Sequence, residues 1–291
     1  MRKKLFFILF MIAAASIAAS AISRIVTDTI HSRILGSPRA VNVYLPKSFD
    51  TDSTRTYPIL YLLHGLGGDN NDWTNNSHLW SIADQLIRSG EAEEMVIVTP
   101  DADRGLGDDL QCGYFNVPGW AYEDFFFKEF IPRIESKYRA GGSKGKRAIA
   151  GLSMGGGGTT GYAQHHPEMF AAAYPMSAVM TLEKTLTGTR DINKDDKLGR
   201  WYRSINDNDH VKFVTEADDA RKEALKSVLW FVDCGDDDFL FDGNIAFYQA
   251  MRSAKIPCEL RVRDGIHDWV YWELSLYDCL PFVSRAFRNG K

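Results

Sequence analysis

The pattern of apolar and polar positions predicts a chain in which short strands alternate with helices. Residues 25–30 and 41–45 favour an opening pair of antiparallel strands, because apolar and polar side chains alternate along the second of them. Continuous apolar runs, typical of strands covered on both faces, follow at residues 59–63, 95–98, 148–152, 170–174, 228–232 and 260–262. Helical patterns follow at residues 79–87, 122–138, 154–165, 245–252 and 274–287.

This alternation indicates an α/β fold with a mostly parallel central sheet and helices on both faces. Residues 180–226 break the rhythm, because they are charged, rich in aspartate and lack strong apolar runs. Within them, residues 216–227 have the composition of a solvated helix. We expect residues 180–226 to form an insertion or cap that either shapes a substrate site or decorates the surface.

The first residues predict export. Met1-Arg2-Lys3-Lys4 is basic, residues 5–19 are apolar, and Ala19-Ser20-Ala21 supplies small residues for cleavage, which is the pattern of a secretory signal peptide. The alternative is a retained membrane anchor, but the apolar stretch is short for a spanning helix. We therefore predict a signal peptide at residues 1–21, one catalytic domain at residues 22–291, and a secreted or periplasmic protein.

Charge and cysteine content limit the partners, disulfides and metal sites that we expect. The formal net charge is −4 for the whole chain and −7 without residues 1–21, with no basic stripe, so we expect no nucleic-acid partner and no membrane association after signal cleavage. The four cysteines allow three disulfide pairings in an exported chain, although Cys234 ends an apolar run and fits a buried thiol equally well. The cysteines are too widely spread for a metal cluster, and the acidic residues at 101–109 fit turns better than a metal site. We therefore expect no metal or cofactor.

Residues 148–156 carry the most informative motif. They have the pattern of a buried strand that breaks into a glycine-rich helix start at Gly151-Leu152-Ser153-Met154-Gly155, which is the G-x-S-x-G nucleophile elbow. Glycines two residues before and after the serine allow a tight turn that exposes Ser153 Oγ, and the helix N-terminus that follows can stabilise negative charge. The alternative is a tight strand-to-helix turn with an incidental serine.

A serine hydroxyl needs a base, an acid that orients the base, and donors for an oxyanion before it can act as a nucleophile. After an elbow of this kind, the acid and then the base follow in chain order. His267 comes directly after the last predicted strand, at the sheet edge where a base belongs. The acid is one of Asp236, Asp237 and Asp238, and spacing alone does not choose between them.

Two backbone amides fit the oxyanion donors. The strand at residues 59–63 runs into His64-Gly65-Leu66-Gly67-Gly68, a loop of small residues that can bring the Leu66 N–H towards a substrate carbonyl oxygen. The N–H of Met154, directly after the nucleophile, is the second donor. His64 is then a structural part of the loop and not a base.

With these motifs in place, the chain resembles the esterase-D-like branch of the α/β-hydrolases, which includes the feruloyl and acetylxylan esterases of carbohydrate esterase family one and the S-formylglutathione hydrolases. The likeness covers nearly all of the chain after residue 41 and rests on residues 62–68, 100–103, 151–156, 234–240 and 265–269. In such enzymes the acid precedes a Phe-Leu pair, which implies Asp238 as the acid. The resemblance also implies the α/β-hydrolase fold and the Leu66 and Met154 amides as oxyanion donors. The chain departs from the family in its glycine run at 155–158 and its insertion at 180–226.

Together these features predict an exported serine esterase that hydrolyses feruloyl or acetyl groups on plant cell-wall carbohydrate through a Ser153–His267–Asp238 triad. The substrate is then a small-molecule or oligosaccharide ester, and Trp269, two residues from the base, is a candidate to stack on it. Two other functions are compatible with the scaffold: acyl transfer of the mycolyltransferase type, and a non-catalytic carbohydrate-binding module. The intact triad and oxyanion loop argue against the module, because binding alone needs none of them.

Overall fold

The centre of the molecule is a sheet of eight strands. These are β1 (Arg24–His31), β2 (Pro38–Leu45), β3 (Ile59–Leu63), β4 (Val96–Pro100), β7 (Arg147–Leu152), β8 (Ala172–Met176), β9 (Leu229–Gly235) and β10 (Glu259–Arg263). Their order is β1-β2-β4-β3-β7-β8-β9-β10. β1 is antiparallel to β2, and β2 is antiparallel to β4. The other neighbours in the sheet are parallel, so that β4, β3, β7, β8, β9 and β10 all run in one direction. The predicted opening pair and the mostly parallel sheet are therefore confirmed.

The computed structural model describes residues 22–102, 113–182, 187–188, 191 and 196–290. The predicted signal peptide at residues 1–21, Cys112 and most of the acidic segment at 101–109 lie outside the described residues. Within the described ranges, no helix has the length and apolar character needed to cross a membrane.

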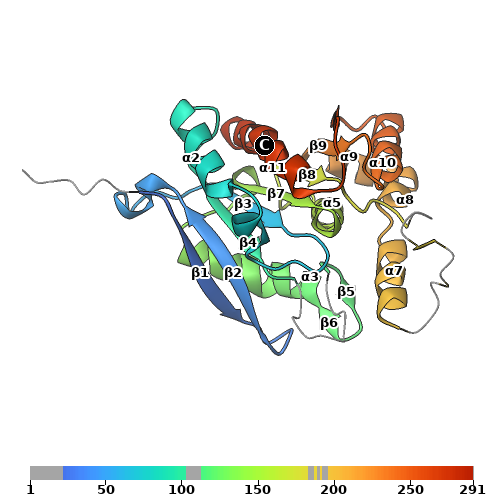
Figure 1. The fold of residues 1–291 in the computed structure, drawn as a ribbon, viewed down its shortest axis with the longest axis horizontal. Coiled ribbons are helices and arrows are strands. Elements are labelled where there is room, and N and C mark those ends of the chain that lie inside the picture. The colour runs from blue at the N-terminus through green and yellow to red at the C-terminus, as the bar shows by residue number, and fades with distance from the viewer. Residues whose placement is uncertain (1–21, 103–112, 183–186, 189–190, 192–195, 291) are drawn as a thin grey trace, which may run out of the picture.

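Helices cover both faces of the sheet, as the sequence predicts (Figure 1). They are α1 (Asp72–Asn75), α2 (Leu79–Ser89), α3 (Tyr122–Phe125), α4 (Ile131–Lys137), α5 (Met154–His165), α7 (Lys197–Asp207), α8 (His210–Thr215), α9 (Asp219–Lys226), α10 (Phe241–Ser253) and α11 (Trp269–Asn289). Short 3-10 turns lie at η1 (Lys47–Asp50) and η3 (Lys144–Lys146), a π-helical turn at η2 (Phe126–Phe130), and a small hairpin at β5 (Asn116–Val117) and β6 (Trp120–Ala121).

Two hydrophobic cores lie on opposite faces of the sheet. Along β3, Tyr61 and Leu63 enter the core under α3, α5 and α10, whereas Leu60 and Leu62 enter the core under α2 and α11. Successive strand residues point to opposite faces, so a strand covered on both sides must be apolar at every position. This is why the run at residues 59–63 is apolar throughout.

Some boundaries differ from the predicted ones for physical reasons. α11 begins at Trp269, earlier than predicted, because the Asp268 carboxylate accepts a hydrogen bond from the Tyr271 N–H at 3.0 Å and caps the helix. β8 begins at Ala172, two residues later than predicted, and Phe170 packs into the core ahead of the strand. The predicted helix at residues 122–138 is α3, η2 and α4 in succession.

The described part of the segment at residues 180–226 contains α7, α8 and α9. Its aspartates have a structural role, because Asp196, Asp209 and Asp218 each precede a helix. Their side chains accept hydrogen bonds from the N–H three residues on, at 3.0, 2.8 and 2.8 Å, and such caps contribute about 1 kcal/mol each. The solvated helix predicted at residues 216–227 corresponds to α9.

α7 packs against two loops at the end of the sheet. Its apolar residues cluster with Val179 and Leu240, which lie in the loops after β8 and β9. Figure 1 shows α7 at the margin of the molecule, away from α2 and β1. The segment therefore contacts both loops that leave the sheet next to the predicted catalytic residues.

The described cysteines carry thiols. Cys234 and Cys279 are buried, Cys258 is half-buried, and they form no disulfide with one another. Burial raises the pKa of the Cys258 thiol to about 12, which suppresses the thiolate that disulfide exchange requires. The interpretation of Cys234 as a buried thiol is confirmed.

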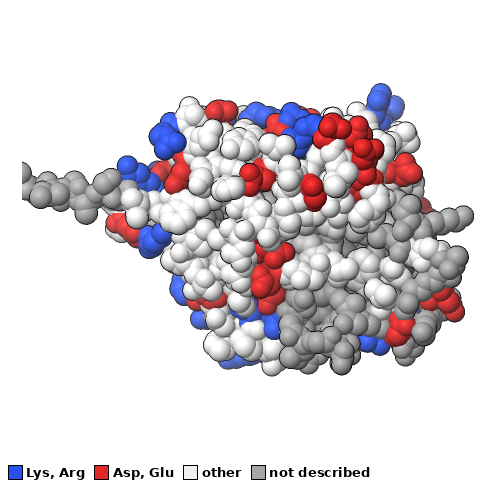
Figure 2. Space-filling model, viewed as in Figure 1, with Lys and Arg blue, Asp and Glu red and all other residues white. Residues whose placement is uncertain are grey.

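Acidic and basic side chains are mixed over the face of the molecule that Figure 2 draws. Figure 2 shows both kinds on one face, and the described residues drawn there form no broad basic patch. This distribution agrees with the mildly acidic net charge of the chain.

Candidate active site

Ser153 occupies the sharp turn between β7 and α5. Its backbone has φ 54° and ψ −116°, a conformation that costs roughly 1–3 kcal/mol for a residue with a side chain. The Ser153 N–H donates to Met176 O at 2.9 Å, and Ser153 O accepts from Gly157 N at 3.0 Å and Val179 N at 3.1 Å. These hydrogen bonds hold the strained turn, with Ser153 at the carboxyl end of the parallel strands.

Two glycines of the elbow are required by close backbone contacts. A Cβ at Gly151 would lie 2.5 Å from Gly155 O, and a Cβ at Gly155 would lie 2.5 Å from His64 O. Real Cβ atoms essentially never come this close to another atom, so a larger residue at either site would force the backbone apart. The second contact also seats the first turn of α5 against the loop after β3.

His267 lies between Ser153 and Asp238, on the loop from β10 to α11. Its Nε2 is 2.9 Å from Ser153 Oγ, and its Nδ1 is 2.9 and 2.8 Å from the two carboxylate oxygens of Asp238. An ionised carboxylate can only accept, so Nδ1 carries the ring proton. Nε2 is then free to accept the proton of the serine hydroxyl.

Asp238 is the aspartate that the structure places beside His267. The residue is 4% exposed, and its Oδ1 also accepts from the Leu240 N–H at 2.8 Å. Burial alone would raise the pKa of Asp238, but the hydrogen bond and charge of His267, together with the Leu240 N–H, lower it below its ordinary value. Asp238 is therefore ionised at neutral pH and suited to stabilise a protonated imidazole.

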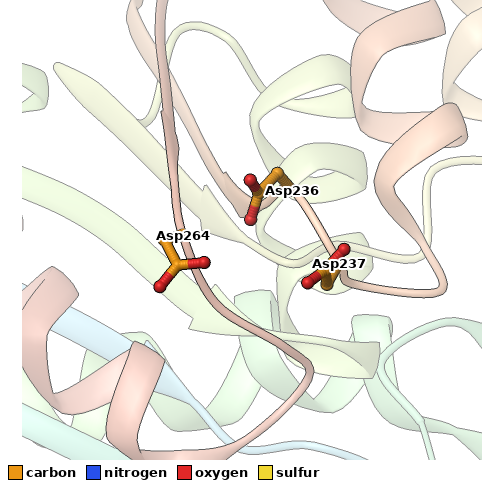
Figure 3. A group of neighbouring side chains, drawn as sticks. All are labelled: Asp236, Asp237 and Asp264. Atoms are coloured by element: carbon orange, nitrogen blue, oxygen red, sulfur yellow. The ribbon is translucent and has the colours of Figure 1, made fainter.

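Asp236 and Asp237, which spacing alone left open as the acid, lie beside Asp264. Figure 3 shows both on the loop after β9, with Asp264 on the loop after β10. One oxygen from each of the three carboxylates lies within 4.8 Å of the others, and Asp236 accepts from the Gly265 N–H at 3.1 Å. All three are exposed, and exposed acidic groups are common without a metal ion. The cluster does not by itself indicate a metal site.

The loop that carries Leu66 and the first residue of α5, Met154, both adjoin the nucleophile. A Cβ built on Gly65 would be 3.6 Å from Ser153 Cβ, so the loop that carries Leu66 runs beside the elbow. Met154 is the first residue of α5, and the first N–H groups of a helix have no acceptor within the helix. The structure thus brings the Leu66 loop and the N-terminus of α5 together at Ser153.

His64 is fixed by backbone partners. Its Nε2 accepts from the Ala102 N–H at 2.9 Å, and its Nδ1 donates to Gly65 O at 2.7 Å. The Tyr114 hydroxyl donates to His64 O at 3.0 Å. Both ring nitrogens are thus used to hold the loop after β3, which matches the structural role expected for His64.

Trp269 lies in a group of aromatic rings that includes His267. Its ring centroid is 5.3 Å from those of Trp73 and Trp272, and Trp272 lies edge-on to His267 at 4.9 Å. Trp269 is half-buried by these neighbours. The contacts give it a packing role, and its predicted contact with substrate stays a prediction.

A pocket beside Met154 was not predicted from the sequence. It is lined by Gly113, Tyr114, Phe115, Met154, Gly157, Val179, Trp201, Ser204, Ile205, Asn208 and His210. The contribution of α7 had a signal in the sequence, since Leu198, Trp201, Tyr202 and Ile205 recur at helical spacing within an otherwise charged segment. The insertion therefore forms one wall of a pocket next to a predicted oxyanion donor.

Comparison with known proteins assigns the chain to a protein family. Residues 32–283 match the family described as "Putative esterase". A solved structure named ferulic acid esterase is 53% identical to this chain with a TM-score of 0.86, and the alignment covers 91% of this chain and 99% of that one.

Two curated relatives are longer proteins. An endo-1,4-beta-xylanase/feruloyl esterase of Xylanibacter ruminicola is 32% identical over 146 residues, which is 49% of this chain and 20% of the relative. Endo-1,4-beta-xylanase Y of Acetivibrio thermocellus is 28% identical over 282 residues, which is 89% of this chain and 23% of the relative. The chain thus matches about a fifth of the length of these two relatives. By the match over residues 32–283, it belongs to this esterase family, as a serine carboxylesterase of the α/β-hydrolase fold.

Proposed function

We propose that this chain is an exported esterase that hydrolyses feruloyl or related acyl esters on plant cell-wall carbohydrate. One observation carries the proposal: hydrogen bonds join Ser153 Oγ to His267 and His267 to Asp238, with Ser153 at a strained strand-to-helix turn. The names of the relatives support the substrate class. The 53% identical structure is named a ferulic acid esterase, and both longer relatives are named xylanases.

In the acylation half of the reaction, Ser153 Oγ attacks the ester carbonyl carbon while His267 Nε2 takes the hydroxyl proton. The carbonyl oxygen becomes an oxyanion that accepts from the Leu66 and Met154 amides, and each such donor is worth about 3 kcal/mol of transition-state stabilisation. When the bond to the alcohol oxygen breaks, His267 gives its proton to that oxygen. The acyl group stays on Ser153, and Asp238 remains ionised throughout.

In the deacylation half, a water molecule replaces the departed alcohol. His267 Nε2 takes one proton from the water as its oxygen adds to the acyl carbon, and the same amides hold the second oxyanion. Collapse of this intermediate breaks the bond to Ser153 Oγ, which recovers its proton from His267. The products are a free acid and a free alcohol.

The pocket beside Met154 has aromatic walls and a small cavity volume of about 30 Å³. Tyr114, Phe115 and Trp201 line it, and aromatic rings pack favourably against the faces and edges of another planar ring. Ser204 and Asn208 add polar groups on the α7 side, which fits a phenolic substituent. Because this volume is too small to choose between the acyl groups by itself, we favour feruloyl over acetyl on the name of the 53% identical structure, a ferulic acid esterase.

The composition of residues 1–21 supports the proposal that the protein is exported. Their basic start, apolar stretch and small-x-small end have the pattern of a cleavable signal, and a polymer substrate fits a protein that leaves the cell. Mass spectrometry of the mature protein should then find an N-terminus near Ile22, whereas an intact Met1 terminus on exported protein would contradict cleavage.

Replacement of Ser153 by alanine tests the catalytic assignment. We expect kcat on simple aryl esters to fall by roughly 10⁴-fold or more, because the variant cannot form the acyl-enzyme. Labelling by an organophosphonate should disappear as well, with circular dichroism showing an unchanged fold. Turnover within about tenfold of the wild type would overturn the triad.

A substrate panel tests the acyl group and the acceptor. Acetyl, butyryl and feruloyl esters are each compared on aryl and xylo-oligosaccharide leaving groups, and we expect the highest kcat/KM for the feruloyl xylo-oligosaccharide. A preference for acetyl esters would contradict the feruloyl assignment and leave the triad standing. Added sugar should leave free acid as the product, and acyl transfer to the sugar would contradict hydrolysis.

A further inference from the structure

Asn244 is a buried polar residue outside the proposed reaction. It lies in the first turn of α10 and is 0% exposed. Its Oδ1 accepts from the Ala178 N–H at 3.2 Å, and its Nδ2 donates to Ala178 O at 2.9 Å and to Leu240 O at 2.8 Å. One carboxamide therefore joins two backbone segments that are far apart in the sequence.

Ala178 belongs to the loop that supports the nucleophile. Residues on both sides of Ala178 form hydrogen bonds with the Ser153 backbone. Met176 O accepts from the Ser153 N–H at 2.9 Å, and the Val179 N–H donates to Ser153 O at 3.1 Å. Between Met176 and Ala178, Ser177 has a φ of 43°, so the chain leaves β8 in a sharp turn. The position of this loop sets the position of the Ser153 backbone.

Leu240 belongs to the loop that supports the acid. Its N–H donates to Asp238 Oδ1 at 2.8 Å, while its carbonyl oxygen accepts from Asn244. Asp238 in turn lies 2.8 Å from His267 Nδ1. A shift of Leu240 therefore moves Asp238 and His267 relative to Ser153.

We propose that Asn244 is a positioning residue that fixes the separation between these two loops, and so keeps His267 Nε2 within reach of Ser153 Oγ. The proposal rests on the catalytic roles given under the proposed function. It adds a requirement for a residue that touches neither the substrate nor any member of the triad through its side chain.

A carboxamide suits this place because it carries the same kind of donor and acceptor as a peptide group. Towards Ala178 it pairs as a neighbouring strand would, and its second N–H remains for Leu240 O. Aspartate has no N–H to offer to either carbonyl oxygen. Alanine would leave buried backbone groups of Ala178 without partners, which is costly in a protein core.

Asn244→Ala and Asn244→Ser test the proposal in the full chain. Misplacement of reacting groups by about 1 Å can cost about 10²-fold in rate, so we expect kcat on a feruloyl aryl ester to fall by about 10- to 100-fold. KM should change by less than about threefold, because neither variant replaces a residue that lines the pocket. The rate of organophosphonate labelling at Ser153 should fall with kcat. The serine variant should lie between alanine and wild type, since its hydroxyl can bond one of the backbone groups.

Ser284→Ala is the control that separates positioning from lost stability. Ser284 is also buried and accepts one backbone hydrogen bond, from the Glu93 N–H at 2.9 Å, but it lies in α11. We expect this variant to lower Tm and to keep kcat within about twofold of wild type. The positioning role is overturned if both Asn244 variants keep wild-type kcat, or lose no more kcat than Ser284→Ala at equal loss of Tm. Activity retained in Ser153→Ala would instead overturn the proposed function.

Discussion

At the scale of single residues, His210 is a buried base that the proposed reaction leaves unused. It is 3% exposed and pairs twice with Gln164: its Nδ1 lies 2.9 Å from Gln164 Oε1, and Gln164 Nε2 donates to His210 O at 3.0 Å. Burial, with a smaller contribution from His165, lowers the pKa of His210 to about 3. The folded protein therefore keeps this ring neutral in the pH range where a free histidine takes up a proton.

We predict that His210 makes the free energy of unfolding decrease as the pH falls from about 6.5 towards about 3. In this window the unfolded chain binds a proton at His210 and the folded chain does not, so stability rises with pH and levels off above the unfolded pKa. At pH 5 the loss amounts to about 2 kcal/mol. Urea unfolding at pH 7 and pH 5 measures it, and His210→Gln should show a smaller difference between the two pH values than wild type.

The exposed histidine His31 provides the matched control. His31→Gln should keep the wild-type difference in stability between pH 7 and pH 5, because this side chain is solvated in both states. An equally large difference in His210→Gln would show that other groups cause the acid sensitivity.

Single residues also show what sequence order can and cannot predict. Ser153 followed from its motif, and His267 from its place directly after a strand, because parallel strands deliver their C-terminal loops to one edge. Spacing did not choose among Asp236 to Asp238, since adjacent loop residues point in different directions; the family resemblance implied Asp238, and the structure places Asp238 beside His267. Asn244 left no signal, because its partners are backbone atoms, which every residue provides.

At the scale of elements, α5 is weakened by its own sequence and supported by its packing. Glycine costs about 0.8–1.0 kcal/mol relative to alanine at each interior helix position, and α5 contains glycine at residues 155–158 and 161. A Cβ at Gly158 would lie 2.7 Å from the Tyr114 ring, and one at Gly161 would lie 2.4 Å from the Phe115 ring. The glycine run, which departs from the family pattern, allows these rings to rest on the helix backbone.

We predict that Gly161→Ala destabilises the fold by about 1–3 kcal/mol, because overpacking against Phe115 outweighs the gain in helix propensity. Phe115→Ala removes the ring that the new methyl group would meet. The double variant should therefore lose less stability than the sum of the two single losses, as measured by chemical denaturation of all four proteins. Strict additivity would show that the ring and the glycine do not interact.

The strands were easier to predict than the helices of the insertion. Strands covered on both faces must be apolar at every position, and this gives a continuous signal such as residues 59–63. In α7 the apolar side chains of Leu198, Trp201 and Ile205 are separated by charged and polar residues, so composition masked a clear helical period. The Asp caps of α7, α8 and α9 raised the acidic content of the segment further, and only the helix at residues 216–227 was predicted within it.

At the scale of the whole molecule, the sheet brings loops from distant parts of the chain to one edge, and α7 packs over that edge. Its apolar side contacts Val179, which bonds to the Ser153 backbone, and Leu240, which bonds to Asp238. The same helix forms a wall of the pocket beside Met154. The insertion therefore shares its contacts with both the catalytic loops and the pocket beside Met154, which favours a role in substrate choice over decoration of the surface.

We predict that Trp201→Ala changes which esters are hydrolysed more than how fast any ester is hydrolysed. Removing one aromatic wall should lower kcat/KM for a feruloyl ester by about tenfold, since one lost apolar contact is worth about 1–3 kcal/mol, and leave an acetyl ester within about threefold of wild type. Trp80→Ala is the matched control, because Trp80 is 41% exposed on α2 and does not line the pocket; it should leave both values within about twofold. Equal losses on the two esters in Trp201→Ala would mean that α7 supports the catalytic loops without selecting the acyl group.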